Sequence, residues 1–522
     1  MTISNHYRTL GPLAVISALL LVETSLAEVR LPEVFSSAMV LQQQKPITLW
    51  GWANPGETVT IELAGKKQLA TANTHGEWRT SLPAMTAGGP FTLNVAASNQ
   101  IKLDDILIGE VWLCSGQSNM EMGVGMALNA KEEIAAANYP KIRLLSIPRV
   151  VSNVPQPHTN ASWKACSPET IAEAGWGGFS ATAYYFGRAL HQSLKVPVGL
   201  INSSWGGTRI EPWTPPEGFA TEPALKAIYD GSQLADPRTP QHQQRLADYL
   251  TSIDAWSAAA RSAMTKQELV PTMPAYPKEL ANLTESKPVA LYNGMINPLV
   301  PMTMRGCIWY QGEANHTEGM LYADKTRALV NGWRKTFQQD DLAYYYVQIA
   351  PYQYGDEDAT ILAKFWEAQA AAMTIPNTGM VVTTDIGNVT DIHPTNKQEV
   401  GRRLALWALA KTYHKTNTVF SGPVFKSMAT SGKQLRLTFD HVGGGLVSRD
   451  GKPLNWFEII DGDTGTAVPA TATIDGNTVV LTAATVNNPV GMRFAWSKLA
   501  EPNFSNKDGL PALPFRAGKN PT

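Results

Sequence analysis

The chain has 522 residues, 44% of them hydrophobic, which is enough to bury several cores and to form two to four domains. Its 43 basic and 44 acidic side chains give a formal net charge of −1, and no basic block is present. This balance argues against nucleic acid or an anionic membrane surface as a partner, and it favours neutral or small ligands.

The first 27 residues have the pattern of a signal peptide. A short polar start is followed by the apolar run "GPLAVISALLLV" and then by Ser25 and Ala27, small residues at the positions that a signal peptidase reads. The alternative is a membrane anchor, but the run is shorter than the about 20 residues that span a bilayer. We therefore expect an exported protein, periplasmic or extracellular, with a mature chain that starts near Glu28 and has no membrane span.

Three compositions follow one another along the mature chain. Residues 28–106 contain short strands separated by Gly, Pro and Asn turns, which predicts an N-terminal β-sandwich domain. Residues 107–414 alternate apolar strands with amphipathic helices, which predicts an α/β domain with a parallel sheet. Residues about 214–290 interrupt this pattern as a helical insertion, and residues 415–522 return to strands and turns, which predicts a C-terminal β domain.

Ser118 follows the apolar strand candidate "EVWLCS" and the turn residue Gly116. Ligand sites of parallel α/β sheets lie beyond the carboxyl ends of the strands, so the Ser118 hydroxyl could act there as a nucleophile and its N–H could bind an oxyanion. The alternative is a helix N-cap serine, because the stretch is not a GxSxG elbow.

Two further strand ends carry polar groups. In "GLINSSWGGTRIEPW", Gly206 and Gly207 let the backbone approach a ligand, and Arg209 could hold a polar or anionic group; a tight turn with a structural arginine is the alternative. In "RGCIWYQGEANH", Gln311 could supply an amide to an oxyanion, and Glu313 could bind substrate or orient Arg209. His316 in the same stretch is expected at the surface.

His393 combines three features that no other histidine of the chain shares. It follows the strand candidate "MVVTT", Asp385 and Asp391 lie near it, and Pro394 disfavours a helical conformation at His393. A loop histidine beside carboxylates has the parts of a general base with its orienting acid.

Together these four stretches resemble the sequence blocks of the SGNH hydrolases. The short motifs "GQSNM", "SSWGGT", "WYQGE" and "DIHP" resemble those of the sialate O-acetylesterase family of carbohydrate esterases. The resemblance covers nearly all of residues 28–515. It implies a flavodoxin-like parallel sheet flanked by β-sandwich domains.

The resemblance also implies roles for individual residues. Ser118 would be the nucleophile and His393 the general base, with an oxyanion hole formed by the N–H groups of Ser118 and Gly206 or Gly207 and by the Gln311 amide. Four residues around them would contact the substrate, namely Gln117, Asn119, Arg209 and Glu313. The usual Asp-x-x-His ending is altered here because Thr390 takes the place of the aspartate; we expect Asp391 to orient His393, with Asp385 or no acid as the alternatives.

The expected reaction is hydrolysis of acetyl esters through an acetyl-serine, with no metal or other cofactor. The substrate would be an O-acetylated carbohydrate, either sialic acid or a plant polysaccharide such as xylan or xyloglucan; a carbohydrate-binding protein without activity is a third interpretation. Cys114 and Cys307 are expected as buried thiols rather than a disulfide. The sequence does not indicate an oligomeric state.

Overall fold

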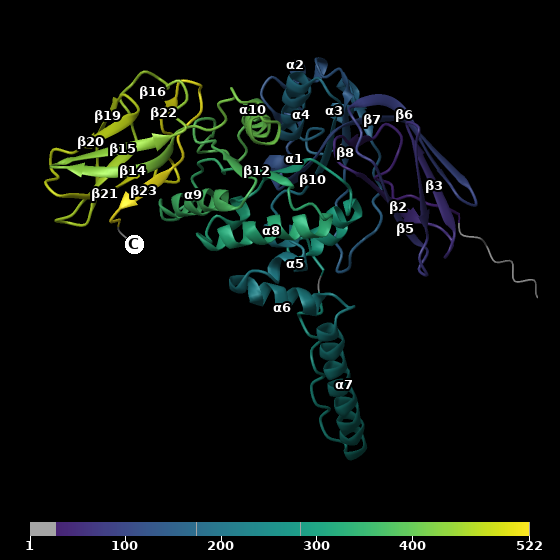
Figure 1. Cartoon of the computed structure of the whole chain (residues 1–522). Helices are drawn as coiled ribbons and strands as arrows, with labels where there is room; N and C mark the ends of the chain where they lie inside the picture. The colour runs from purple at the N-terminus through teal and green to yellow at the C-terminus, as the bar shows by residue number, and fades with distance from the viewer. Residues whose placement is uncertain (1–27, 174, 282, 521–522) are drawn as a thin grey trace, which may run out of the picture.

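The computed structural model describes residues 28–173, 175–281 and 283–520, so the predicted signal peptide lies outside the described residues. A central α/β domain lies between an N-terminal and a C-terminal β region (Figure 1). Within the described ranges, no helix is both long and apolar enough to cross a membrane.

The central sheet confirms the predicted α/β class. Its strands run in the order β13-β12-β11-β7-β10-β8-β9, all parallel except β9, which pairs antiparallel with β8. The strands are β7 (Gln100–Gly116), β8 (Tyr139–Ser146), β9 (Lys164–Cys166), β10 (Val198–Ser204), β11 (Gly306–Tyr310), β12 (Ala343–Val347) and β13 (Thr378–Val381). When β8 is left aside and the other parallel strands are numbered in chain order, the neighbours β10-β7-β11-β12-β13 have the order 2-1-3-4-5 of a doubly wound sheet.

Helices cover both faces of this sheet, and the alternation of side chains along β7 shows why. Val111 and Leu113 belong to the core that includes α8 and α9, whereas Trp112 and Cys114 belong to the core that includes α4 and α10. A strand buried on both faces must be apolar throughout, as this one is. The covering helices are α4 (Ala181–Leu194), α8 (Leu321–Phe337), α9 (Ile361–Ala371) and α10 (Lys397–Trp407); the shorter helices α1 (Ser118–Glu121), α2 (Ala130–Ala135) and α3 (Pro168–Ala172) lie in connections.

The N-terminal β region shares strand β7 with the central sheet. The first half of β7 pairs antiparallel with β6, and its second half pairs in parallel with β10 and β11. The strand therefore crosses the position between residues 106 and 107 where the composition changes. The other strands of this region are β1 (Val40–Gln42), β2 (Ile47–Trp52), β3 (Thr58–Leu63), β4 (Lys66–Thr71), β5 (Glu77–Leu82) and β6 (Gly88–Ala96).

The C-terminal region contains two four-stranded antiparallel sheets, β14-β15-β20-β19 and β18-β17-β21-β23. Their aromatic side chains meet in one core, where Phe425 of β14 stacks on Phe515 of β23 with ring centroids 4.8 Å apart. The strands are β14 (Val424–Ser431), β15 (Gln434–Asp440), β16 (Leu446–Ser448), β17 (Phe457–Asp461), β18 (Ala467–Pro469), β19 (Thr471–Asp475), β20 (Thr478–Thr482), β21 (Pro489–Phe494), β22 (Phe504–Asn506) and β23 (Phe515–Gly518).

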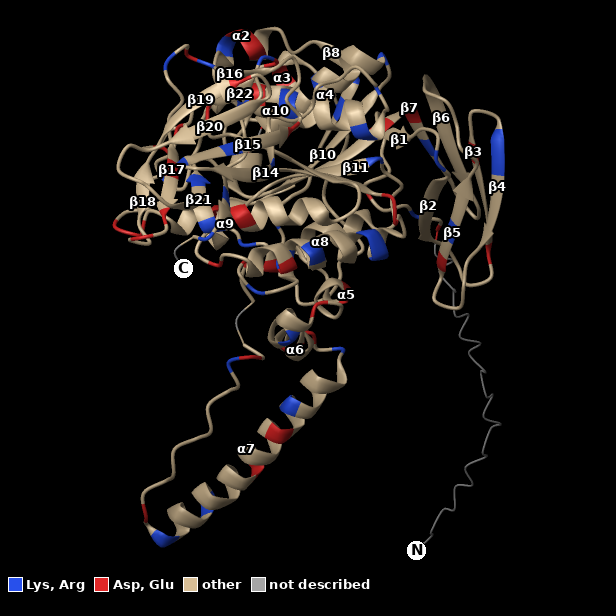
Figure 2. Ribbon diagram, turned by 60° about the vertical axis from the view of Figure 1, so that its left-hand side comes forward, with Lys and Arg blue, Asp and Glu red and all other residues tan. Residues whose placement is uncertain are grey.

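The segment expected as a helical insertion contains α5 (Pro216–Phe219), α6 (Lys226–Ala235) and α7 (Pro240–Lys266). Helix α7 projects from the body of the molecule and mixes charges of both signs along its length (Figure 2). The returning chain packs along it, since Trp256 donates its indole N–H to the Pro271 carbonyl at 2.7 Å and Tyr249 contacts Tyr276.

Candidate active site

Three adjacent parallel strands deliver the candidate residues to one edge of the sheet. Ser118 follows β7, Gly206 follows β10 and Gln311 follows β11, while His393 lies in the loop between β13 and α10. The turn after β7 requires glycine, because Gly116 has a φ of 141° and an added Cβ would lie 2.2 Å from the Tyr310 carbonyl oxygen.

Ser118 and His393 are in direct contact. The Ser118 Oγ lies 2.9 Å from the His393 Nε2, within hydrogen-bond distance. Ser118 is the first residue of α1, and the N-cap position belongs to Gln117, so the alternative of an N-cap serine is wrong. A serine hydroxyl bound to an imidazole is the arrangement in which the imidazole can take the hydroxyl proton.

The carboxylate nearest to the His393 ring, that of Asp391, lies beyond hydrogen-bond distance of it. The Asp391 Oδ1 lies 3.8 Å from the His393 Nδ1, and the same oxygen accepts the His393 backbone N–H at 2.9 Å. Asp385 instead pairs with the buried Arg403 through two bonds of 2.7 and 2.6 Å. Of the two acids that the sequence leaves open, only Asp391 is directed at the histidine.

The surroundings of His393 favour the neutral form of its imidazole. Burial, and after it the nearby Lys397 ammonium, lowers the pKa of His393, while Asp391 acts weakly in the opposite direction. The Trp176 ring meets the imidazole edge to face, with centroids 4.8 Å apart. A neutral imidazole is the form that a general base requires.

A buried polar network involves the chain neighbours of Ser118 and His393, namely Asn119 and Ile392. Asn119 donates through its Nδ2 to the Glu313 Oε1 at 2.5 Å and to the Ile392 carbonyl at 3.0 Å, and its Oδ1 accepts from the Lys397 Nζ at 2.5 Å. Burial lowers the pKa of Lys397 to about 7 and raises that of Glu313. Asn119 and Glu313, expected at the substrate, are buried here and fix the chain next to His393 instead.

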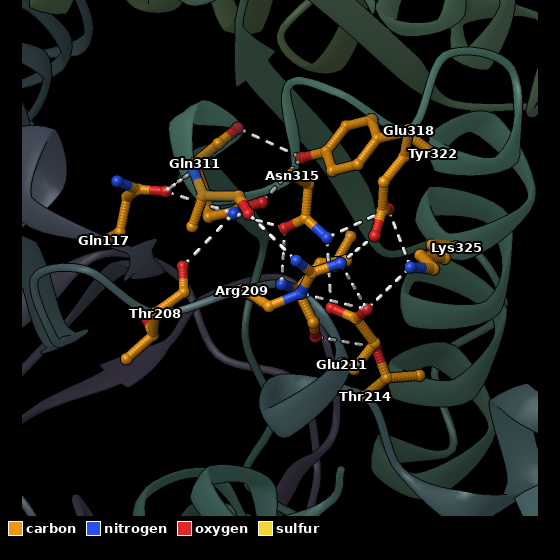
Figure 3. Close-up of polar contacts among 12 residues, drawn as sticks. Gln117, Thr208, Arg209, Glu211, Thr214, Gln311, Asn315, Glu318, Tyr322 and Lys325 are labelled. Atoms are coloured by element: carbon orange, nitrogen blue, oxygen red, sulfur yellow. Dashed lines mark hydrogen bonds and ion pairs between the residues drawn. The ribbon is translucent and has the colours of Figure 1, made fainter. Parts of the chain in front are cut away.

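The two glutamines expected at the site also bond to protein groups. The Gln117 Oε1 accepts from the Gln311 Nε2 at 3.1 Å, and both side chains are buried. The Gln311 Nε2 also faces the Thr208 carbonyl at 3.2 Å and the Asn315 Oδ1 at 2.8 Å (Figure 3). Both amide hydrogens of Gln311 are therefore engaged, which differs from the free oxyanion donor that the sequence predicts.

Of the three backbone N–H groups expected to bind the oxyanion, one is already bonded to the protein and two are not. The Gly206 N–H donates to the Glu121 Oε2 at 2.7 Å. Within the part of the chain that the structure describes, no acceptor binds the N–H of Ser118 or of Gly207, and Ser118 opens a helix, where N–H groups lack helical partners. These two N–H groups are the donors that stay free for a developing oxyanion.

Arg209, the expected clamp for an anionic substrate group, belongs to a compact ion network (Figure 3). Its guanidinium pairs with Glu211 and Glu318 and donates to the Ala314 carbonyl at 3.2 Å. The buried Lys325 pairs with the same two carboxylates at 2.6 and 2.7 Å. The network joins the turn after β10 to helix α8, which favours the interpretation of Arg209 as a structural arginine.

Several residues of the site carry no clear sequence signal. Lys397 lies four residues beyond His393, a spacing that could have directed attention to it, whereas Lys325 comes from an unremarkable stretch. The prediction that His316 lies at the surface is wrong. Its side chain is only 14% exposed, pairs with Glu357 and stacks on Tyr354.

All three cysteines are buried free thiols, as predicted for Cys114 and Cys307. In the described ranges, no group of three or more His, Cys, Asp or Glu side chains is placed to hold a metal ion.

The chain is similar to carbohydrate esterases of known sequence and structure. The sequence model of the family described as "carbohydrate esterase, sialic acid-specific acetylesterase" matches residues 108–231 and 276–410. The sialate O-acetylesterase of Mus musculus is 31% identical over 79% of this chain and 79% of its own length, and that of Homo sapiens is 29% identical over 76% and 73%. The crystal structure of a carbohydrate acetylesterase from Xanthomonas citri superposes with a TM-score of 0.78 at 33% identity, covering 94% of this chain and all of that one.

Proposed function

Because the chain belongs to the sialate O-acetylesterase family of carbohydrate esterases, we propose that it is an exported serine esterase that removes O-acetyl groups from sugars. The single observation that supports the serine mechanism most strongly is the 2.9 Å contact between the Ser118 Oγ and the His393 Nε2. The assignment of the α/β domain to the SGNH hydrolases rests on the strand order and on the placement of Ser118, Gly206 and His393 around one sheet edge.

In the proposed reaction, the Ser118 Oγ attacks the acetyl carbonyl while His393 takes the hydroxyl proton at its Nε2. The tetrahedral oxyanion accepts hydrogen bonds from the N–H groups of Ser118 and Gly207. The carbon–oxygen bond to the sugar breaks, and the sugar oxygen receives the proton from His393. Water then attacks the acetyl-serine by the same route and releases acetate.

O-acetylated sialic acid is the first candidate substrate, on the evidence of the family. A neutral acetylated polysaccharide, such as xylan or xyloglucan, is the second candidate. It is favoured by Trp176 beside His393 and by Trp205 next to Gly206, because aromatic rings bind sugars without requiring a charge on them. Export rests on the signal-peptide pattern of residues 1–27.

The test is acetate release by the purified wild type and Ser118→Ala on acetylated sialic acid, acetylated xylan and acetylated xyloglucan. Loss of a triad nucleophile is expected to lower kcat by roughly 10⁴-fold or more. Retention of near wild-type activity by the alanine variant would contradict the serine mechanism. The substrate that the wild type turns over fastest decides between the two candidates.

A further inference from the structure

Arg149 is a half-exposed arginine that contacts Trp205 and Glu121, two residues close to Ser118 in the fold. It follows strand β8, and its side chain is 49% exposed. Its guanidinium carbon lies 5.3 Å from the centroid of the Trp205 ring, and one of its nitrogens pairs with the Glu121 carboxylate. Both contacts are favourable for a cation and hold the guanidinium between Trp205 and Glu121.

The two residues that contact Arg149, Trp205 and Glu121, are themselves close to the nucleophile Ser118. Trp205 precedes Gly206, and a Cβ added to Gly206 would lie 3.2 Å from the Ser118 Cβ. Glu121, which ends the helix that Ser118 begins, accepts the Gly206 N–H with its other oxygen at 2.7 Å. Arg149 is therefore held by the two elements that carry the nucleophile and the glycine turn.

Arg149 also keeps hydrogen-bond donors for a ligand. A guanidinium has five N–H groups in a planar fork that matches a carboxylate. Within the described residues, its one hydrogen-bond partner is Glu121. Arg209 differs, because two carboxylates and a carbonyl already occupy its donors.

We propose that Arg149 binds the carboxylate of an acetylated acidic sugar and so selects such substrates over neutral ones. This inference rests on the proposed function, since it assigns a recognition residue to the esterase site at Ser118. The exposed edge of the guanidinium binds the sugar carboxylate, while Glu121 and Trp205 hold the arginine in place. The acetyl ester then reaches Ser118 from a sugar whose anionic group is already bound.

The experiment compares wild type, Arg149→Gln and the control Arg516→Gln on three acetyl esters. Arg516 is also paired with a carboxylate, Glu367, and also lies over a tryptophan ring, 5.0 Å from the centroid of Trp496, but it belongs to the C-terminal region. The esters are O-acetylated sialic acid, a neutral O-acetylated xylo-oligosaccharide and 4-nitrophenyl acetate. Thermal melting verifies that each variant is folded.

We expect Arg149→Gln to lower kcat/KM for acetylated sialic acid by roughly 10- to 100-fold, the range for loss of a charged hydrogen bond. Its kcat/KM for the two neutral esters should stay within about threefold of wild type, because neither presents a carboxylate to the arginine. Arg516→Gln should match wild type on all three. Equal losses of Arg149→Gln on all three esters, or no loss on acetylated sialic acid, would overturn the inference.

A binding measurement separates this inference from the proposed function. Calorimetric titration of sialic acid into Ser118→Ala and into Ser118→Ala/Arg149→Gln requires no turnover. Weaker binding to the double variant by roughly 10-fold or more would support Arg149 as the carboxylate site. Equal binding to both would overturn that role, whereas failure of wild type to release acetate from any sugar would refute the proposed function.

Discussion

Removal of the Asp391 carboxylate tests how strongly His393 depends on its acid. The Asp391 Oδ1 is 3.8 Å from the His393 Nδ1, beyond hydrogen-bond distance, and the aspartate side chain is 54% exposed. Two unit charges at this separation attract by about 1 kcal/mol in water and by about 4 kcal/mol near a protein surface of intermediate polarity. The exposure of Asp391 places the interaction nearer the lower figure.

We therefore expect Asp391→Ala to lower kcat/KM by roughly 10-fold, and at most about 10³-fold, compared with the about 10⁴-fold typical of a triad aspartate. The charge of Asp391 raises the pKa of His393, so its loss should move the acid limb of the pH profile to lower pH. The assay is acetate release from pH 4 to 9, with Asp391→Asn as the control that retains an oxygen for the His393 backbone N–H. A loss of about 10⁴-fold would refute this reasoning, because it would require a direct hydrogen bond in the working enzyme.

Three further predictions follow from the contacts around the site. Lys397→Met should raise the pKa of His393, because the ammonium adds to burial in lowering it, and the acid limb of kcat/KM should move to higher pH; an unmoved limb would contradict this. Asp385→Ala leaves the buried Arg403 without its bidentate partner and should destabilise the fold by about 3 to 5 kcal/mol in a denaturation experiment. A stable Asp385→Ala variant that lost about 10⁴-fold in kcat would instead identify Asp385 as the orienting acid. Gly206→Ala should lower kcat strongly in a folded protein, because the added Cβ would lie 3.2 Å from the Ser118 Cβ; full activity would show that the turn can shift.

The architecture of the central sheet could be predicted because its signals are local. Strands buried on both faces are continuous apolar runs, and the site residues follow the ends of those runs. The positions of Ser118 and His393 after strands predict both as site residues, and the structure brings them into contact although they are 275 positions apart in the chain. Strand β7 shows the limit. The composition changes near residue 106, close to where β10 and β11 replace β6 as pairing partners, but nothing local shows that one uninterrupted strand runs through this boundary.

The roles of the polar residues around Ser118 depended on partners that are distant in the chain. Arg209 is expected from the sequence to face a ligand, but its network is completed by Lys325 of helix α8 and by Glu318 just before that helix, both more than 100 residues away. Asn119 likewise bonds Glu313 and Lys397. A buried amide or charge is satisfied by whichever group the fold brings to it, so the sequence identifies which residues belong to the site more readily than what each one contacts.

The most direct test of the account is to identify the residue that a serine-reactive fluorophosphonate modifies, by peptide mass spectrometry of the wild type and of His393→Ala. The proposed mechanism predicts a single adduct on Ser118 in the wild type, formed much more slowly in His393→Ala because the hydroxyl then lacks its base. An adduct on a different residue, or acetate release that continues after Ser118 is fully modified, would contradict the central claim that Ser118 and His393 form the catalytic pair.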